Sequence, residues 1–488
     1  MSKIDEVSEI VGNSRVTWFV VAILFVALPV AAILVRSSQS VYNDMRAAPS
    51  FGLVAGHPIY QKEVTGPLFC VIYGPLSYLF YTPLFLLKGP SAVFLAGSCL
   101  SFLLYCLPLF HFLQRLRREA ASSPAQMALL LFPFLLFTLY AAPLRISATA
   151  IRADAPALGF GGLACTILFF HDSSRRWRDP LLCALCSVLA VGSKQNMLPL
   201  VLALAVSAAL VHGRVFCARY LLGLLSWGLL TIPVLTLLYG DLSAVVLNSW
   251  VAPSRIRLDW KMLPTAAHAL YREFLPLLLA GGAALVILGT RTLKSIRPLP
   301  FLAAVIALLP PSLLGRVITG GGDNALAPAL YFGLLTLVTG AYLSVTGRPK
   351  VLPQLTALAG LFCLLLIPPL ARNFQPSFVR QMLHPSSSQI VFEYARRHPG
   401  EIYFPFHQTS VFLAERRFYH GEWGVGDYLL ANIPISKEQI LRYIPSTARY
   451  VAYPADAPSD WLLPFLAPGR KMYAVSELSN FRVFEIER

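Results

Sequence analysis

The feature that most constrains this chain is a series of long apolar segments separated by short polar ones. Eleven segments are long, or nearly long, enough to cross about 30 Å of hydrocarbon as helices. They lie near residues 16–36, 91–113, 126–143, 155–171, 181–193, 197–213, 220–239, 274–290, 298–314, 327–346 and 353–370. Because backbone polar groups in hydrocarbon must be satisfied internally, these segments predict a bundle of transmembrane helices.

Composition supports a membrane protein and excludes two other classes. Hydrophobic residues make up 56% of the 488 residues and charged residues 13%, whereas soluble chains have roughly 45–50% and 25%. The net charge of +16 is scattered between apolar segments and forms no single patch, which argues against nucleic-acid binding. The first segment, Val16–Val35, is too long for a signal-peptide core and lacks a small-residue cleavage site, so we expect an uncleaved anchor.

Lysines and arginines predict the orientation in the membrane, because they favour cytoplasmic loops. They follow the even-numbered apolar segments as Arg115, Arg117, Arg118, Arg175, Arg176, Arg178, Arg214, Arg219, Arg291, Lys294, Arg297, Arg348 and Lys350. This pattern places the N-terminus in the cytoplasm and residues 371–488 on the opposite, extracytoplasmic face.

The segment Ile72–Leu87 is apolar enough to be a further span but carries two prolines and three tyrosines. Counting it would place the arginines at 115–118 outside. We therefore expect a juxtamembrane or re-entrant element at the outer interface, where tyrosine is favoured, within an outer loop of residues 37–90.

The tail, residues 371–488, differs in kind from the apolar part. Helix-like pieces at Ser388–Arg397 and Ser436–Ile444 alternate with strand-like pieces at 401–406, 449–453 and 481–486. The sequence thus predicts an all-α polytopic membrane domain over residues 1–370, followed by a small α/β extracytoplasmic domain. Cys183 and Cys186 form a CxxC inside an apolar segment without a second pair, so we expect them to be buried small residues rather than a metal or redox site.

Ionisable residues at membrane depth cost roughly 2.5–3.5 kcal/mol each and usually have a function or a partner. Those at the outer ends of the segments are Asp44, Arg46, Lys62, Glu63, Arg145, Arg152, Asp154, Lys194, Arg316 and Asp323. Isolated basic residues on this side predict contact with an anion such as a lipid phosphate. The alternative is that they pair internally, for example Arg152 with Asp154, or extend to lipid headgroups.

Asp44 is the candidate catalytic carboxylate, since it follows the first segment in a long outer loop. Transfer of a group from a phosphate carrier needs one base for the incoming hydroxyl and no acid for the departing phosphate, whereas glycosidases generally need two carboxylates. Glu63 is the second choice. The alternative for Asp44 is an ordinary solvated loop acid.

Two further motifs have open interpretations. The GGGDN stretch, residues 320–324, either faces an anion with its backbone N–H groups or simply makes a tight turn. The tail carries a polar and aromatic group consisting of His407, His420, Trp423 and Asp427. Because these residues do not have the spacing of metal ligands, we favour structural histidines. The alternative is that this group forms an edge of the site that binds the acceptor.

The order of these motifs resembles the polytopic GT-C glycosyltransferases, above all bacterial members related to lipopolysaccharide-core and dolichyl-phosphate-mannose-type transferases. The matching pieces are an early acidic residue after the anchor, GHPIY leading to YGPLSY, RADAPAL, KQNMLPL and GGGDN, spread over residues 16–346. The resemblance implies about eleven transmembrane helices with juxtamembrane helices. It also implies transfer of a sugar from a polyprenyl-phosphate carrier to an acceptor hydroxyl, with inversion, on the outer face of the bacterial inner membrane.

By position, the resemblance makes Asp44 the base and Arg152 and Lys194 the ligands of the carrier phosphate. As a further isolated cation on the outer side, Arg316 is also expected to contact that phosphate. We further expect Glu63, Tyr73, Asp154, Gln195, Asp323 and Asn324 to contact the substrate. The first loop has NDM rather than a paired acidic motif, so we expect no divalent metal, and we expect no cofactor. The rival interpretation is a transporter or lipid flippase, whose charged residues would lie near the midplane and whose halves would repeat.

Overall fold

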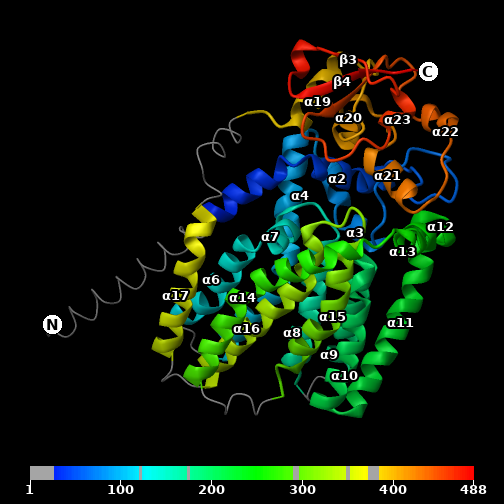
Figure 1. Cartoon of the computed structure of the whole chain (residues 1–488). Coiled ribbons are helices and arrows are strands. Elements are labelled where there is room, and N and C mark those ends of the chain that lie inside the picture. Colours follow the sequence, from blue (N-terminus) through cyan, green and yellow to red (C-terminus); the bar gives the residue numbers. More distant parts are fainter. Residues whose placement is uncertain are drawn as a thin grey trace.

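The computed structural model describes residues 27–119, 124–172, 176–288, 296–347, 352–371 and 384–487. A bundle of apolar helices makes up most of the molecule, and the C-terminal residues form a smaller α/β part at one end of it (Figure 1). Of the first predicted span, only its last part lies in the described residues, as the helix Ala27–Ser38. The residues 16–26 and the basic residues Arg175, Arg291, Lys294, Arg348 and Lys350 lie outside them.

Helices cover each of the other ten predicted spans. They are α4 (Pro90–Tyr105), α5 (Leu107–Glu119), α6 (Pro124–Tyr140), α8 (Asp154–Phe169), α9 (Arg178–Ser193), α10 (Leu198–His212), α11 (Arg214–Tyr239), α14 (Leu263–Leu288), α15 (Leu299–Val317), α16 (Ala327–Gly347) and α17 (Leu352–Ala371). Among the described residues, four helices are individually long and apolar enough to cross a membrane, or six if two bent pairs each count as one span. The predicted span 91–113 is one of these pairs, α4 and α5, bent by 52°. The architecture is therefore polytopic and helical, as predicted.

Helix α11 shows how the bundle meets its surroundings. Its side chains at Leu225, Leu229 and Leu237 are 58%, 57% and 87% exposed. A continuous apolar surface of this kind is unfavourable in water and suits contact with lipid.

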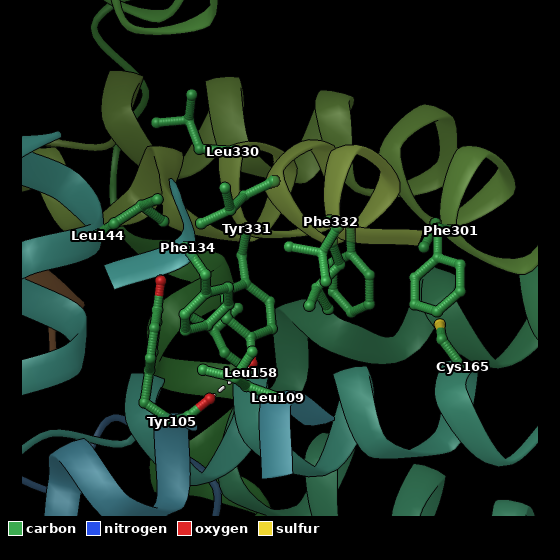
Figure 2. Close-up of a cluster of buried hydrophobic side chains, with 14 of the residues drawn as sticks. Tyr105, Leu109, Phe134, Leu144, Leu158, Cys165, Phe301, Leu330, Tyr331 and Phe332 are labelled. Atoms are coloured by element: carbon green, nitrogen blue, oxygen red, sulfur yellow. Dashed lines mark hydrogen bonds between the residues drawn. The ribbon is translucent and has the colours of Figure 1, made fainter. Parts of the chain in front are cut away.

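The interior of the bundle is filled by aromatic and aliphatic side chains (Figure 2). Tyr105, Phe134 and Tyr331 pack together, and the hydroxyl of Tyr331 donates to the carbonyl of Tyr105 over 2.6 Å. Helices α8 and α4 approach very closely at Gly159, where a Cβ atom would lie 1.9 Å from the carbonyl oxygen of Leu104. Small residues permit this kind of backbone contact between membrane helices.

Short elements cover the end of the bundle that carries the C-terminal part. They are α2 (Val41–Val54), α3 (Leu76–Leu79), η1 (Thr82–Leu86), α7 (Ala142–Thr149), η3 (Gln195–Met197), α12 (Leu242–Val246), η4 (Leu247–Val251), α13 (Ala252–Arg255), η5 (Trp260–Met262) and η7 (Asp323–Leu326). The segment 72–87 thus forms two short helices and no span, as its prolines and tyrosines predicted. Helix α2 lies across this end, between the bundle and the C-terminal part (Figure 1).

The C-terminal part is a four-stranded sheet with surrounding helices. Its elements are α19 (Ser387–Arg397), β1 (Ile402–Tyr403), α20 (Gln408–Glu415), α21 (Glu422–Leu430), α22 (Lys437–Arg442), β2 (Tyr450–Pro454), α23 (Leu463–Leu466), β3 (Met472–Tyr473), η10 (Ser476–Leu478) and β4 (Phe481–Glu485). The strand order is β1-β2-β4-β3, with β1 parallel to β2 and the other pairs antiparallel. The predicted helices and strands are all present, whereas α20, α21, α23 and the two-residue edge strand β3 were not expected.

The outer loop and the C-terminal part share one hydrophobic core. Met45 of α2 and Leu68 of the following loop are buried in the same cluster as Phe406, Val425 and Tyr428. Because apolar contacts of this kind fix relative positions, α21 is held at a defined place over the end of the bundle.

Candidate functional site

Three basic residues from distant segments gather around two tyrosines, and we call Arg46, Arg152 and Lys194 the cationic site. The Arg46 guanidinium carbon lies 4.5 Å from the centre of the Tyr73 ring, and the Lys194 Nζ lies 5.8 Å from the same centre. The Arg152 guanidinium carbon lies 5.6 Å from the centre of the Tyr42 ring. These distances are typical of cation–π contacts.

Helix α2 carries two of the residues that make these contacts, Tyr42 and Arg46. Tyr42 and Arg46 are four residues apart and therefore share one face of the helix. On α2 the side chain of Asn43 accepts a hydrogen bond of 2.9 Å from the backbone N–H of Ile151. This bond holds α2 against the segment that carries Arg152.

Two guanidinium nitrogens of the cationic site have unused hydrogen-bonding capacity. Nη1 of Arg46 and Nε of Arg152 are buried and have no hydrogen-bond partner among the described residues. A buried donor without a partner costs roughly 1–3 kcal/mol, and more when it is charged. Arginine donors of this kind suit a bound phosphate or carboxylate.

Lys194 differs from the two arginines because it has an internal partner. Its Nζ lies 2.6 Å from Oδ1 of Asp154, and the side-chain amide of Asn324 donates to Oδ2 of Asp154 over 3.1 Å. The predicted alternative of internal pairing thus holds for Lys194. The pairing of Arg152 with Asp154 was wrong: these two described residues form no ion pair, and the partners of Asp154 are Lys194 and Asn324.

Gln195 joins the cationic site to the loop before α3. Its amide nitrogen donates to the carbonyl of Ile72 over 2.9 Å, and its Oε1 is buried without a partner among the described residues. The structure therefore brings together six of the predicted site residues: Tyr73, Arg152, Asp154, Lys194, Gln195 and Asn324.

Asp44 faces away from this group. Its carboxylate accepts hydrogen bonds from the backbone N–H groups of Thr409 and Ser410, at 2.7 and 3.1 Å, and from the Ser410 hydroxyl. It thereby caps the N-terminal end of α20. Asp44 is two residues from both Tyr42 and Arg46, so it lies on another face of α2. The alternative of a solvated loop acid was wrong, because the side chain is completely buried; that burial raises the pKa of Asp44 to about 6.

The remaining predicted residues lie at the periphery. Glu63 is exposed. Arg316 pairs with the exposed Asp323 at 3.1 Å and also donates to the carbonyl of Gly321 over 3.0 Å. Gly320 has a φ of +81°, a conformation that favours glycine. The GGGDN stretch is therefore a tight turn, the second of its two predicted interpretations.

The tail histidines have structural environments, as favoured from the sequence. His420 accepts from the backbone N–H of Leu68 over 3.0 Å, and burial lowers its pKa to about 4. His407 is fully buried and contacts the Ser387 hydroxyl at 3.1 Å. Within the described ranges, no three His, Cys, Asp or Glu side chains are grouped so as to hold a metal ion.

Three residues of this region were not assigned to the site from the sequence: Arg46, which belongs to the cationic site, and Cys70 and Asp427, which lie beside it. The Cys70 thiol is buried, which raises its pKa, and it interacts electrostatically with Arg46, Arg152 and Asp427. Asp427 is only 4% exposed, and burial raises its pKa to about 7 against the opposing effect of Arg46. The spacing of Tyr42 and Arg46 on one helix was the only local signal in the sequence for these residues. Asp427 is more than 200 positions from each of Arg46, Arg152 and Lys194 in the chain.

A large, partly open cavity between the helices of the bundle has a different character. It has a volume of about 750 Å³ between α6, α14, α15, α16 and α17 and is lined almost wholly by apolar residues such as Leu277, Val305 and Phe362. None of the described residues that line it is charged. A cavity of this composition does not suit a polar solute.

Comparison with known proteins identifies the architecture. The sequence matches no family model and no curated protein. Two solved structures resemble nearly its whole length. A crystal structure of ArnT from Cupriavidus metallidurans bound to undecaprenyl phosphate has a TM-score of 0.56 and 13% identity over 95% of this chain and 97% of that chain. The chain has the GT-C fold.

The apo structure of the same ArnT gives the same result, with a TM-score of 0.59 and 13% identity over 96% of this chain and 98% of that chain. The GT-C fold therefore includes the C-terminal part as well as the helix bundle. It confirms the resemblance in architecture that the sequence motifs indicated.

Proposed function

We propose that this protein transfers a sugar from a polyprenyl-phosphate carrier to an acceptor hydroxyl at the outer face of a bacterial cytoplasmic membrane. The observation that carries the proposal is the pair of buried guanidinium nitrogens, on Arg46 and Arg152, that lack partners among the described residues. The GT-C fold supports it, and so does the undecaprenyl phosphate bound to one of the ArnT structures.

In this proposal, the carrier phosphate binds between Arg46 and Arg152. Lys194 adds a third positive charge and is held in place by Asp154. Arg46 and Lys194 both lie against the Tyr73 ring, and the Nη1 donor of Arg46 has no partner among the described residues. Fixed cations of this kind stabilise the charge that develops on the departing phosphate, which is commonly the largest catalytic contribution.

The chemical step is a single displacement. The acceptor hydroxyl attacks the anomeric carbon from the face opposite the phosphate, so the anomeric configuration inverts. The phosphate leaves as an anion and needs no acid, whereas the hydroxyl needs a base. Asp44 does not enter this step, because its carboxylate is occupied by α20.

Transport is less well supported. Substrate sites of transporters lie near the bilayer midplane and are built from charged residues and broken helices. Here the three cations of the cationic site lie beside α2 at one end of the bundle, and no described residue that lines the large apolar cavity is charged.

The proposal is tested by supplying membranes that contain the protein with a panel of radiolabelled polyprenyl-phosphate pentoses and hexoses. We expect one of these donors to lose its label to an acceptor. Arg46→Gln and Arg152→Gln should each slow the transfer by about 10²–10³-fold, by analogy with loss of an oxyanion donor.

The matched control is Arg219→Gln. Arg219 also stacks on an aromatic ring, with its guanidinium carbon 4.7 Å from the centre of Trp177, but it belongs to the first turns of α11 rather than to the cationic site. Its variant should keep the parent rate. Donors that all stay intact, or arginine variants that behave like the control, would contradict the proposed function.

A further inference from the structure

A carboxylate near the cationic site with an oxygen that accepts no hydrogen bond is the best candidate for the base that takes the hydroxyl proton. Asp44 accepts three hydrogen bonds from Thr409 and Ser410. Asp154 is engaged by Lys194 and Asn324 through its two oxygens. Asp427 differs from both, because its Oδ2 is buried and has no hydrogen-bond partner among the described residues.

Asp427 is aimed at the cationic site by the packing of α21. The backbone of α21 touches the loop before α3 at Gly424, where a Cβ atom would lie 2.5 Å from the carbonyl oxygen of Leu68. This contact puts Asp427 beside Cys70, two residues further along that loop, and within electrostatic range of Arg46. Arg46 and Asp427 thus each present a buried polar atom without a partner in the same neighbourhood.

Trp423 extends the same face of α21, since it precedes Asp427 by one turn. Its ring lies against Gly320 of the GGGDN turn, 3.9 Å from the position of a Cβ atom there. The Trp423 Nε1 is buried and also lacks a partner among the described residues. An aromatic ring, an indole N–H and a carboxylate on one helical face offer the apolar surface and hydrogen bonds that a sugar needs.

The electrostatic surroundings suit proton transfer near neutral pH. Burial raises the pKa of Asp427 to about 7, and Arg46 and Cys70 limit the rise. A base is most effective when its pKa is close to the working pH. The groups that interact electrostatically with Asp427 are Arg46 on α2, Cys70 on the loop, Tyr78 on α3 and Tyr428 on α21. The same and neighbouring elements also carry Arg255, the paired Arg316 and Asp323, and two other buried carboxylates, Asp44 on α2 and Glu422 on α21, whose pKa values burial raises to about 6 and about 7.

We infer that Asp427 is the proton acceptor for the incoming hydroxyl, so that the C-terminal domain supplies a catalytic residue to the membrane domain. The inference rests on the proposed function. In the step, the hydroxyl oxygen forms a bond to the anomeric carbon while the bond from that carbon to the phosphate oxygen breaks. The hydroxyl proton moves to Asp427, and polyprenyl phosphate leaves with the bonding electron pair.

The test compares Asp427→Asn, Asp427→Glu and the parent in the labelled-donor assay between pH 5 and 9. We expect the parent rate to rise with pH through about 7 as Asp427 loses its proton. Asp427→Asn should lower the rate by about 10²–10⁴-fold and remove this dependence. Asp427→Glu should restore part of the rate together with a pH-dependent limb, which a merely structural role of Asp427 would not do.

The control is Asp460→Asn, which makes the same change at an exposed carboxylate of the same domain, paired with Arg470 at 3.1 Å. It should leave both rate and pH profile unchanged.

If the parent transfers sugar and Asp427→Asn keeps its rate or its pH dependence, the role of Asp427 is refuted while the proposed function stands. A parent that consumes no donor would refute both. Undecaprenyl phosphate binding should be retained in Asp427→Asn, and its loss would reassign Asp427 to carrier binding.

Discussion

The Nζ of Lys194 lies 2.6 Å from Oδ1 of Asp154, and both side chains are buried. The pair joins the start of α8 to the end of α9, residues that are 40 positions apart in sequence. Because Asp154 largely neutralises Lys194, the excess positive charge of the cationic site comes from Arg46 and Arg152. Lys194 therefore has two roles to separate, holding Asp154 and contacting the phosphate.

A variant pair separates these roles. Lys194→Met leaves Asp154 buried without its positive partner, which should cost about 3–5 kcal/mol of stability. Lys194→Met with Asp154→Asn removes both charges and keeps a side chain that Asn324 can contact, so most of the stability should return. Thermal unfolding in detergent measures the stability that Lys194 contributes by holding Asp154. Labelled-donor transfer measures its contribution to contacting the phosphate. If transfer recovers together with stability in the double variant, Lys194 is structural only.

Asp44 offers a second prediction, because its carboxylate, on α2, caps α20 of the C-terminal part. Asp44→Ala should destabilise the docked C-terminal domain by about 1–2 kcal/mol, as expected for a lost helix cap. Thermal unfolding followed by fluorescence of the tail tryptophans would measure this change. Asp44→Asn keeps one acceptor oxygen, so its transfer rate per folded molecule should stay near that of the parent. A loss of about 10²-fold or more in a folded Asp44→Asn would instead restore Asp44 as the base.

Much of the architecture follows from the sequence, because the apolar composition of each membrane-spanning segment is enough to predict a helix there. The interpretation of residues 72–87 as a surface element also follows from local features, its prolines and tyrosines. The two short helices there, α3 and η1, confirm it.

The site was only partly predictable, because its key relationships are long-range. The sequence placed Asp44 and Arg46 in the same loop, but which of them faces the other cations depends on the rotation of α2 about its axis. Tertiary packing of Met45 into the C-terminal core sets that rotation. Likewise, the sequence around Asp427 does not predict that it is buried while Asp323 is exposed. Asp427 is buried where α21 packs against the backbone of Leu68.

Gly424 gives a prediction about this docking. Gly424→Ala would place a methyl group 2.5 Å from the carbonyl oxygen of Leu68, and overpacking of this kind costs about 1–3 kcal/mol. Because the shift would also move Asp427, transfer should fall by at least about tenfold although no charge is altered. Gly228→Ala is the control, since no atom lies within 4 Å of the added carbon. Equal rates of sugar transfer in Gly424→Ala and Gly228→Ala would show that transfer does not depend on the position of α21.

His420 makes the stability of the C-terminal domain pH-dependent. Its Nδ1 accepts from Leu68, and burial lowers its pKa from 6.5 to about 4. As the pH falls, His420 therefore binds a proton in the unfolded state before it does so in the folded state. The stability that neutral His420 contributes is complete above about pH 6.5 and is lost as the pH falls toward 4. The loss should reach about 3 kcal/mol at 1.4 kcal/mol per pKa unit.

His420→Gln keeps an acceptor and a donor without a titratable ring. The difference in unfolding free energy between parent and variant should therefore shrink as the pH falls from 6.5 to 4. This difference isolates His420 from the buried carboxylates, whose raised pKa values act in the opposite direction. A difference that does not change with pH would contradict the prediction.

The most direct measurement is the affinity of the purified protein for undecaprenyl phosphate without a sugar, because it depends on the cationic site and on no chemical step. We predict saturable binding by the parent and by Arg219→Gln, and a loss of affinity of about 100-fold or more when Arg46→Gln and Arg152→Gln are combined, equivalent to at least about 2.7 kcal/mol. Unchanged affinity in the double arginine variant would show that the two unpartnered guanidinium groups do not bind the carrier phosphate.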